Sequence, residues 1–140
     1  MFVVLDTNHF NELRENSAAA KRLAARIEER HADVFSCIVA AEESLHGWIA
    51  YVRKHKPGAD QLYAYSRLQA CLETLTELTI IPFDEDAVSI FNVLQQRHRR
   101  IGTMDLKIAA ICLVHEATLL TRNVRDFDCI QGLRVENWLD

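Results

Sequence analysis

Residues 2–8 read FVVLDTN, four apolar residues followed by an aspartate, a threonine and an asparagine. An extended run without polar side chains cannot face water on either side, so residues 2–5 predict a central strand that helices cover on both faces. Asp6 then follows the carboxyl end of this strand, at the rim of the sheet where ligands and reacting groups gather in open α/β folds. What this protein does depends on which side chains join Asp6 at that rim.

Strands and helices are predicted to alternate along the rest of the chain. Apolar runs predict strands at 34–37, 79–83 and 118–121 and a short edge strand at 133–136, and helical spacing predicts helices at 17–30, 39–55, 62–78, 85–100 and 104–116. Asp84 and Thr103 are suited to cap the last two helices, and the two helices between the second and third strands should project as an antiparallel pair. The predicted fold class is α/β, a three-layer α/β/α sandwich around a mainly parallel sheet of four to five strands with right-handed crossovers.

Size and composition indicate one domain in a reducing compartment. A chain of 140 residues can bury about two-thirds of its unfolded surface, so we expect residues 1–140 to form a single domain. The four cysteines show no Cys-x-x-Cys spacing, which favours buried thiols over zinc ligands. Neither a signal peptide nor an apolar stretch of roughly 20 residues is visible, so we expect a cytoplasmic protein rather than a secreted or membrane-spanning one.

Three further places put acidic groups where this topology should bring them to the rim beside Asp6. Glu43 and Asp105 lie in the first turn or two of predicted helices, and the turn at 123–126 follows the fourth strand. Each acid has an ordinary alternative role. Asp6 could cap a following helix, Glu43 could be one more exposed acid beside Glu42, and Asp105 could complement the dipole of its helix.

Clustered carboxylates favour a hard cation. At a separation of about 5 Å and an effective dielectric constant of about 20, each like-charged pair costs roughly 3 kcal/mol. A protein relieves this repulsion by raising pKa values or by binding a divalent ion, and oxygen ligands select Mg²⁺ or Mn²⁺. Such ions activate water and hold a phosphodiester. The sequence contains no nucleophile elbow and no glycine-rich phosphate loop that would indicate another chemistry.

Four segments together resemble the PIN-domain ribonucleases, and more closely the VapC-like toxins of bacterial toxin–antitoxin pairs. They are LDTN at 5–8, AEESLHG at 41–47, GTMDLKIAA at 102–110 and LTRNVRDF at 120–127, and the similarity continues to GLRVENW at 132–138. The resemblance spans nearly the whole chain and implies a single PIN-like nuclease domain.

The resemblance also implies Mg²⁺- or Mn²⁺-dependent endonucleolytic cleavage of RNA. The implied catalytic and metal-binding residues are Asp6, Glu43, Asp105 and Asp126. Glu43 is preferred to Glu42 because it stands four residues before Gly47, as the family acid does. Some members carry an aspartate where this chain has Asn123, so either Asn123 or Asp126 fills the fourth position. The implied supporting groups are Thr7, Asn8, Thr121 and Asn123.

The family resemblance implies protein partners as well. A homodimer that aligns two sites is expected, together with a cognate antitoxin whose C-terminal segment occupies the cleft.

The basic runs at 53–56 and 97–100 and two aromatic residues have open interpretations. Four cations flank Asp105 in the sequence, namely Arg97, Arg99, Arg100 and Lys107. They could contact RNA phosphates, or they could be solvated charges that complement helix C-termini. Trp48 and Tyr51 follow Glu43 by about one turn and are predicted to pack in the core or an interface, with base stacking as the alternative.

Two rival functions compete with a nuclease. A phosphatase of the haloacid-dehalogenase type also begins with an aspartate after its first strand, but it needs a second aspartate where this chain has Asn8, and the chain has no room for a cap domain. A catalytically weak PIN-like module that only binds RNA or protein is the other alternative, and Asn123 favours it.

Overall fold

Five parallel strands form the sheet in the computed structural model, which describes residues 1–140. The strands are β1 (Phe2–Leu5), β2 (Asp33–Cys37), β3 (Thr79–Ile81), β4 (Thr118–Leu120) and β5 (Arg134–Glu136). Their order is β3-β2-β1-β4-β5, and every neighbouring pair is parallel. The predicted parallel α/β sheet is therefore confirmed, including its short edge strand, with β1 at the centre.

β1 is buried on both faces, as its sequence predicts. Val3, Val4 and Leu5 are each 0% exposed. Successive side chains of a strand point to opposite faces, and accordingly Val4 joins one apolar cluster whereas Val3 and Leu5 join the other. The core thus consists of two layers, one on each side of the sheet.

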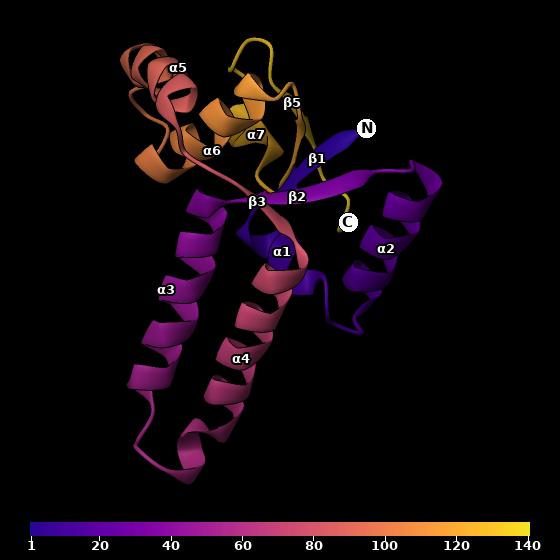
Figure 1. Ribbon diagram of the computed structural model, residues 1–140, viewed down its shortest axis with the longest axis vertical. Helices are drawn as coiled ribbons and strands as arrows, with labels where there is room; N and C mark the ends of the chain where they lie inside the picture. The colour runs from indigo at the N-terminus through magenta and orange to yellow at the C-terminus, as the bar shows by residue number, and fades with distance from the viewer.

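Seven α-helices accompany the sheet (Figure 1). They are α1 (Thr7–Glu12), α2 (Ala18–Glu29), α3 (Ile38–Lys54), α4 (Leu62–Glu77), α5 (Glu85–Arg97), α6 (Thr103–Val114) and α7 (Val124–Phe127), with a 3₁₀ turn at Ala59–Gln61 before α4. Side chains of α5, α6 and α7 pack in the cluster that contains Val4. Side chains of α1, α2 and α4 pack in the other cluster. Helices on both faces of a parallel sheet are the predicted three-layer sandwich.

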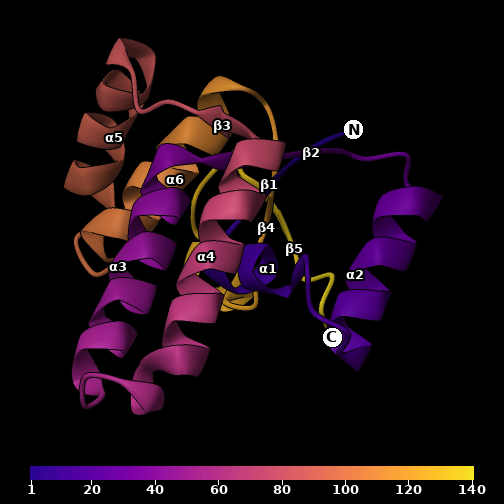
Figure 2. The same ribbon diagram turned by 60° about the horizontal axis from the view of Figure 1, so that its bottom comes forward.

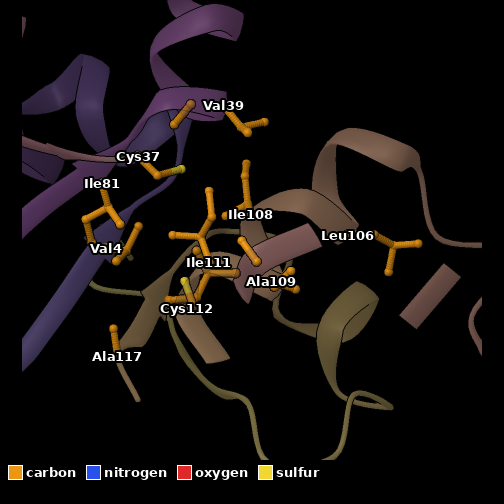
Figure 3. Close-up of a cluster of buried hydrophobic side chains, with 14 of the residues drawn as sticks. Val4, Cys37, Val39, Ile81, Leu106, Ile108, Ala109, Ile111, Cys112 and Ala117 are labelled. Carbon is orange, nitrogen blue, oxygen red and sulfur yellow. The ribbon is translucent and has the colours of Figure 1, made fainter. Parts of the chain in front are cut away.

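α6 is buried on almost every side. In Figure 3, Ile108 and Ile111 of this helix lie among Val4 of β1, Cys37 of β2 and Ile81 of β3. The residues from Ile108 to Cys112 are all at most 2% exposed, and the two alanines among them allow the helix to approach the sheet closely. This packing fixes the start of α6, where Asp105 lies.

α3 and α4 lie side by side and project from the sheet as the predicted antiparallel pair (Figures 1 and 2). The apolar spacing that predicts α4 is not its most buried face, because Leu62 and Leu72 are 74% and 49% exposed. Ala64 and Cys71 are buried instead. The pair projects from the sheet (Figure 1), so part of the surface of α4 stays exposed to solvent.

Three predicted boundaries are corrected by the structure. α5 ends at Arg97 rather than near residue 100. β3 ends at Ile81, since Pro82 has no backbone N–H to continue the strand pairing. Gly102, not Thr103, occupies the N-cap of α6, and Thr103 is its first helical residue. No helix combines the length and the apolar character required to span a bilayer.

Candidate functional site

The carboxyl ends of β2, β1 and β4 lie next to one another and lead into the predicted site. Leu5 of β1 pairs with Leu120 of β4, and the Asp6 N–H donates to the Leu120 carbonyl oxygen at 3.0 Å. α3 follows β2 directly and packs against both α1 and α6. The segments that carry Asp6, Glu43, Asp105 and the turn after β4 therefore meet at one rim of the sheet.

Asp6 is the N-cap of α1, a helix that was not among the predicted elements. Its Oδ1 accepts a hydrogen bond from the His9 N–H at 3.0 Å and another from the His9 ring Nδ1 at 3.1 Å. The capping role that the sequence offered as an alternative is thus real. It leaves Oδ2 without a hydrogen bond from the protein, and the side chain is 13% exposed, so this oxygen is available to a ligand.

His9 is a site residue that the sequence interpretation missed. Its side chain is 0% exposed and lies between Asp6 and the backbone N–H of Trp138, which donates to Nε2 at 3.1 Å. The one sequence signal for this role of His9 was its position three residues after Asp6. A polar residue three places after a capping aspartate lies one helical turn away from it and can return its side chain to the cap.

Glu43 faces the same site from the second turn of α3. The Thr7 hydroxyl donates to Glu43 Oε1 at 3.3 Å. Burial raises the pKa of the Glu43 carboxyl, the Thr7 hydrogen bond lowers it, and the charges of Asp105 and Asp6 raise it further. Glu42 is exposed on another face of the helix. Of these two neighbouring acids, only Glu43 is hydrogen bonded to a predicted supporting residue.

Asp105 occupies the first turn of α6 and is half-buried. Burial is the largest cause of the raised pKa of its carboxyl, followed by the charge of Asp126 and then that of Asp6. Asp105 thus interacts electrostatically with each of the other three predicted acids, Asp6, Glu43 and Asp126, although the four come from different elements.

The turn after β4 contains both candidates for the fourth position, Asn123 and Asp126. Asn123 is the N-cap of α7 and its side chain makes no capping hydrogen bond, while its N–H donates to the Thr121 hydroxyl at 3.1 Å. Asp126 is the acid of this turn whose charge acts on Asp105. Asn123 is a neutral amide and has no charge to act on Asp105, so both residues stay candidates, and the hydrogen bond from the Asn123 N–H to Thr121 holds the turn that carries them. Asn8 is exposed and forms no side-chain hydrogen bond.

The thiol of Cys37 is affected by the charges of two of the predicted acids. It is 0% exposed at the end of β2. Burial raises its pKa, nearby backbone hydrogen bonds lower it, and the charges of Glu43 and Asp6 raise it. The charges of Glu43 and Asp6 thus disfavour the Cys37 thiolate, so the thiol is expected to stay protonated.

The donor set of this site fits a hard divalent cation. Its members are carboxylates with hydroxyl and amide groups beside them, and oxygen ligands suit Mg²⁺ and Mn²⁺. Desolvation and mutual repulsion at Glu43 and Asp105 are both relieved by a positive charge. In their present positions, no three His, Cys, Asp or Glu side chains lie close enough together to hold a metal ion.

A hollow of about 230 Å³ opens beside Glu43. Its lining includes Thr7, Asn11, Trp48 and Tyr51. The Trp48 and Tyr51 rings meet edge to face at 5.8 Å, and the Arg67 guanidinium lies 5.0 Å from the Trp48 ring centroid. These contacts are the packing role that was predicted for the two aromatic residues.

The four cations that flank Asp105 in sequence are free of ion pairs. Arg97 lies in the last turn of α5, where it complements the helix dipole, and Arg99 and Arg100 are exposed in the turn that leads to α6. The Lys107 ammonium lies 5.9 Å from the Phe83 ring centroid. None of them appears among the salt bridges of the chain, so their charges are available to a ligand.

Comparison with known proteins points to one family. A family model described as "PIN domain" matches residues 3–132. Ribonuclease VapC1 of Haemophilus influenzae (strain R2866) is 27% identical over 143 residues, which cover 99% of this chain and 98% of that protein. Ribonuclease VapC1 of Rickettsia felis is 46% identical over 61 residues, and that match spans 41% of this chain and only 46% of the relative.

The fold is also similar to that of solved structures. The structure of VapBC-1 from nontypeable Haemophilus influenzae includes a chain that superposes with a TM-score of 0.75 at 23% identity, covering 100% of both chains. At this identity the similarity establishes the shared fold.

Proposed function

The chain belongs to the PIN-domain family, and on this premise we propose that it is a divalent-metal-dependent endoribonuclease, the toxin of a VapC-type toxin–antitoxin pair. The two relatives described above bear the name Ribonuclease VapC1. The similarity to the Haemophilus influenzae protein covers almost the full length of both chains, which supports the transfer of the activity.

One observation carries the proposal. Asp6, Glu43, Asp105 and Asp126 come from segments that begin at a single rim of the sheet. The charges of Asp6 and Asp126 raise the pKa of Asp105, and the charges of Asp105 and Asp6 raise the pKa of Glu43. Four helix-end acids with separate structural roles would have no reason to share one partly desolvated environment, because each like-charged pair costs folding free energy. A cation that binds there offsets this cost.

Asp6, Glu43 and Asp105 would hold Mg²⁺ or Mn²⁺, and Asp126 would complete the set. When bound, the metal would activate water for attack on an RNA phosphodiester and stabilise charge on the leaving oxygen. Thr7 orients the Glu43 carboxylate by its hydrogen bond. Thr121 holds the turn that presents Asp126. Asn8 and Asn123 are close in sequence to Asp6 and Asp126 and are proposed as supporting polar groups.

The basic residues before and within α6 would bind the substrate. We propose that Arg97, Arg99, Arg100 and Lys107 contact RNA phosphates, because they are unpaired and lie in the segment that carries Asp105. Such contacts provide affinity with little sequence preference.

The proposed assembly follows the solved relatives. The VapBC-1 structure gives a toxin–antitoxin complex as the precedent for a cognate antitoxin here. A homodimer and a cytoplasmic location are part of the same proposal, and four unpaired cysteines agree with a reducing compartment.

The decisive experiment compares purified wild type with Asp105→Asn on single-stranded RNA in Mn²⁺. We expect the wild type to cut internal phosphodiester bonds and the variant to lose at least 100-fold in rate, while its circular dichroism spectrum is unchanged. Glu42→Gln is the matched control, since this acid is exposed and its charge has the smallest effect among those that raise the pKa of Glu43, and it should cut as fast as wild type.

The outcomes separate the rival functions. If Asp105→Asn cuts RNA as fast as wild type, the proposed site is wrong. If neither protein cuts RNA but both bind it, the chain is a binding module. Phosphate release from a phosphomonoester with a phosphorylated aspartate would instead indicate a phosphatase.

A further inference from the structure

His9 connects the two ends of the chain inside the core. Its ring is 0% exposed, with Nδ1 at 3.1 Å from Asp6 Oδ1 and Nε2 at 3.1 Å from the Trp138 backbone nitrogen. These partners lie 3 and 129 residues away in the sequence. Both ring nitrogens are therefore engaged, one by an acid of the proposed site and one by the C-terminal segment.

The backbone partner determines the tautomer of the ring. A peptide N–H can only donate, so Nε2 has to present its lone pair to Trp138. The ring proton consequently resides on Nδ1, which donates to Asp6 Oδ1.

The hydrogen bonds of His9 also orient the Asp6 carboxylate. Oδ1 accepts from the His9 N–H and from the His9 ring, whereas Oδ2 accepts no hydrogen bond from the protein. Two donors on one oxygen prevent rotation of the carboxylate and keep the other oxygen free. Partners of this kind, one step removed from a ligand, control how well that ligand binds.

The C-terminal segment that supports His9 is itself held in place. Trp138 and Leu139 are 2% and 0% exposed. From α2, Arg22 Nε donates to the Leu139 carbonyl oxygen at 2.6 Å, and Arg26 Nη1 donates to the Asn137 carbonyl oxygen at 2.8 Å. The Trp138 N–H is therefore a fixed donor and not a frayed end.

We propose that His9 is a positioning residue that couples residues 137–139 to the Asp6 carboxylate. The tail fixes the tautomer of His9, and His9 fixes the orientation of Asp6. The consequence for metal binding rests on the proposed function, because it requires Asp6 to be a ligand, whereas the tautomer and the orientation of Asp6 do not.

The first test measures Mn²⁺ affinity by electron paramagnetic resonance in two variants of His9. His9→Leu removes both hydrogen bonds of the ring, and His9→Asn restores a donor at the position of Nδ1 without an acceptor for Trp138. We expect His9→Leu to bind Mn²⁺ about 10-fold or more weakly, and His9→Asn to return to within about threefold of wild type. A folded His9→Leu with wild-type affinity would overturn the proposal, as would equal losses in both variants.

The second test does not depend on a metal. In the nitrogen-15 spectrum of the His9 ring, Nδ1 should carry the proton and Nε2 should show the shift of an unprotonated nitrogen. The carboxyl carbon-13 resonance of Asp6 should move in His9→Leu and return in His9→Asn. A proton on Nε2, or an Asp6 resonance that is unchanged in His9→Leu, contradicts the proposal even if the protein proves not to bind Mn²⁺.

A third variant keeps the proposal testable if His9→Leu fails to fold. Arg22→Ala combined with Arg26→Ala removes the three hydrogen bonds that these side chains donate to the carbonyl oxygens of Asn137, Leu139 and Asp140 and leaves His9 intact. We expect the Trp138 amide to exchange its hydrogen at least 10-fold faster and the Asp6 carboxyl resonance to shift in the same direction as in His9→Leu. Faster exchange without any change at Asp6 would show that the tail and Asp6 are not coupled.

Discussion

Single residues of this site serve the fold and the proposed chemistry together. Asp6 caps α1 through Oδ1, and its Oδ2 accepts no hydrogen bond from the protein. Glu43 is different, because nothing in its surroundings neutralises its charge. It has one donor, Thr7, and its burial and three acids, Asp105, Asp6 and Glu42, all oppose ionisation. Glu43 therefore destabilises the metal-free protein in its charged form, and this gives a measurable effect of pH.

Replacing Glu43 by Gln should stabilise the metal-free protein at neutral pH. The pKa of Glu43 is raised above its ordinary value of 4.5 in the folded state, so the folded protein holds this proton to a higher pH than the unfolded chain does. Stability is lost as pH rises through the interval between the two pKa values. At pH 7 we expect a gain of about 2–4 °C in melting temperature, corresponding to about 0.5–1 kcal/mol at this partly solvated position.

The pH dependence provides the control for this prediction. The advantage of Glu43→Gln should shrink as the pH falls towards 4.5 and vanish below it, once the carboxyl is protonated in both the folded and the unfolded state. Glu42→Gln, at the exposed neighbour, should change the melting temperature by less than about 1 °C at either pH. An advantage that is the same at pH 7 and pH 4.5 would mean that charge repulsion is not its cause.

Among the elements, α6 links the buried core to the proposed site, because Asp105 lies in its first turn. Its middle is completely buried against the sheet, which holds its N-terminus at the rim. The turn before it contains Arg99 and Arg100, and α5 ends with Arg97. α5 and α6 therefore bring unpaired cations and Asp105 into one short stretch of chain.

Removing the cations at 97, 99 and 100 together should weaken RNA binding without affecting the chemical step. We expect the triple alanine variant to raise KM about 10-fold and to leave kcat within twofold. The logarithmic dependence of KM on salt should become less steep by about 0.7 for each lost phosphate contact. The melting temperature should hardly change, because these side chains form no ion pairs.

A second basic cluster supplies the comparison for this variant. Arg53 and Lys54 lie in the last turn of α3, about 15 Å along the helix from Glu43, and their replacement by alanine should leave KM unchanged. If both variants behave like wild type, the cations near α6 are solvated charges at helix ends, the alternative that their sequence context also allows.

At the scale of the whole molecule, the site exists because the chain crosses the sheet repeatedly in one direction. Parallel pairing brings the carboxyl ends of β2, β1 and β4 to the same rim. Each acid is supplied by the segment that leaves a strand there or by a helix that starts there. The repulsion among the acids is thus a property of the assembled fold, and so is its relief by a cation.

Mn²⁺ at a concentration about 100 times its dissociation constant should stabilise the folded protein by about 2.7 kcal/mol, because the unfolded chain has no such site. For a chain of this size we expect a rise of about 5–10 °C in melting temperature. Calorimetry with and without a chelator measures it. Asp105→Asn should show less than half of this rise, and a wild-type protein whose melting temperature ignores both Mg²⁺ and Mn²⁺ would argue against the clustered site.

The sequence by itself determined the architecture. The apolar run at residues 2–5 can only be stable when covered on both faces, and alternation with helical stretches permits little other than a parallel α/β sheet. The order of the acids along the chain, together with the PIN-like segments, also indicated where the site would form. Local features that depend on adjacent residues, such as the cap at Asp84 that accepts from the Ala87 N–H, were predictable for the same reason.

Only the tertiary structure decided how the site is held. His9 gave no strong signal because its role depends on a backbone N–H 129 residues away. That the charge of Asp126 raises the pKa of Asp105 depends on how the turn after β4 lies against the start of α6. Sequence periodicity reports which face of an element is buried, but hydrogen bonds and charge interactions between distant segments depend on three-dimensional distances, and these are established when the sheet assembles.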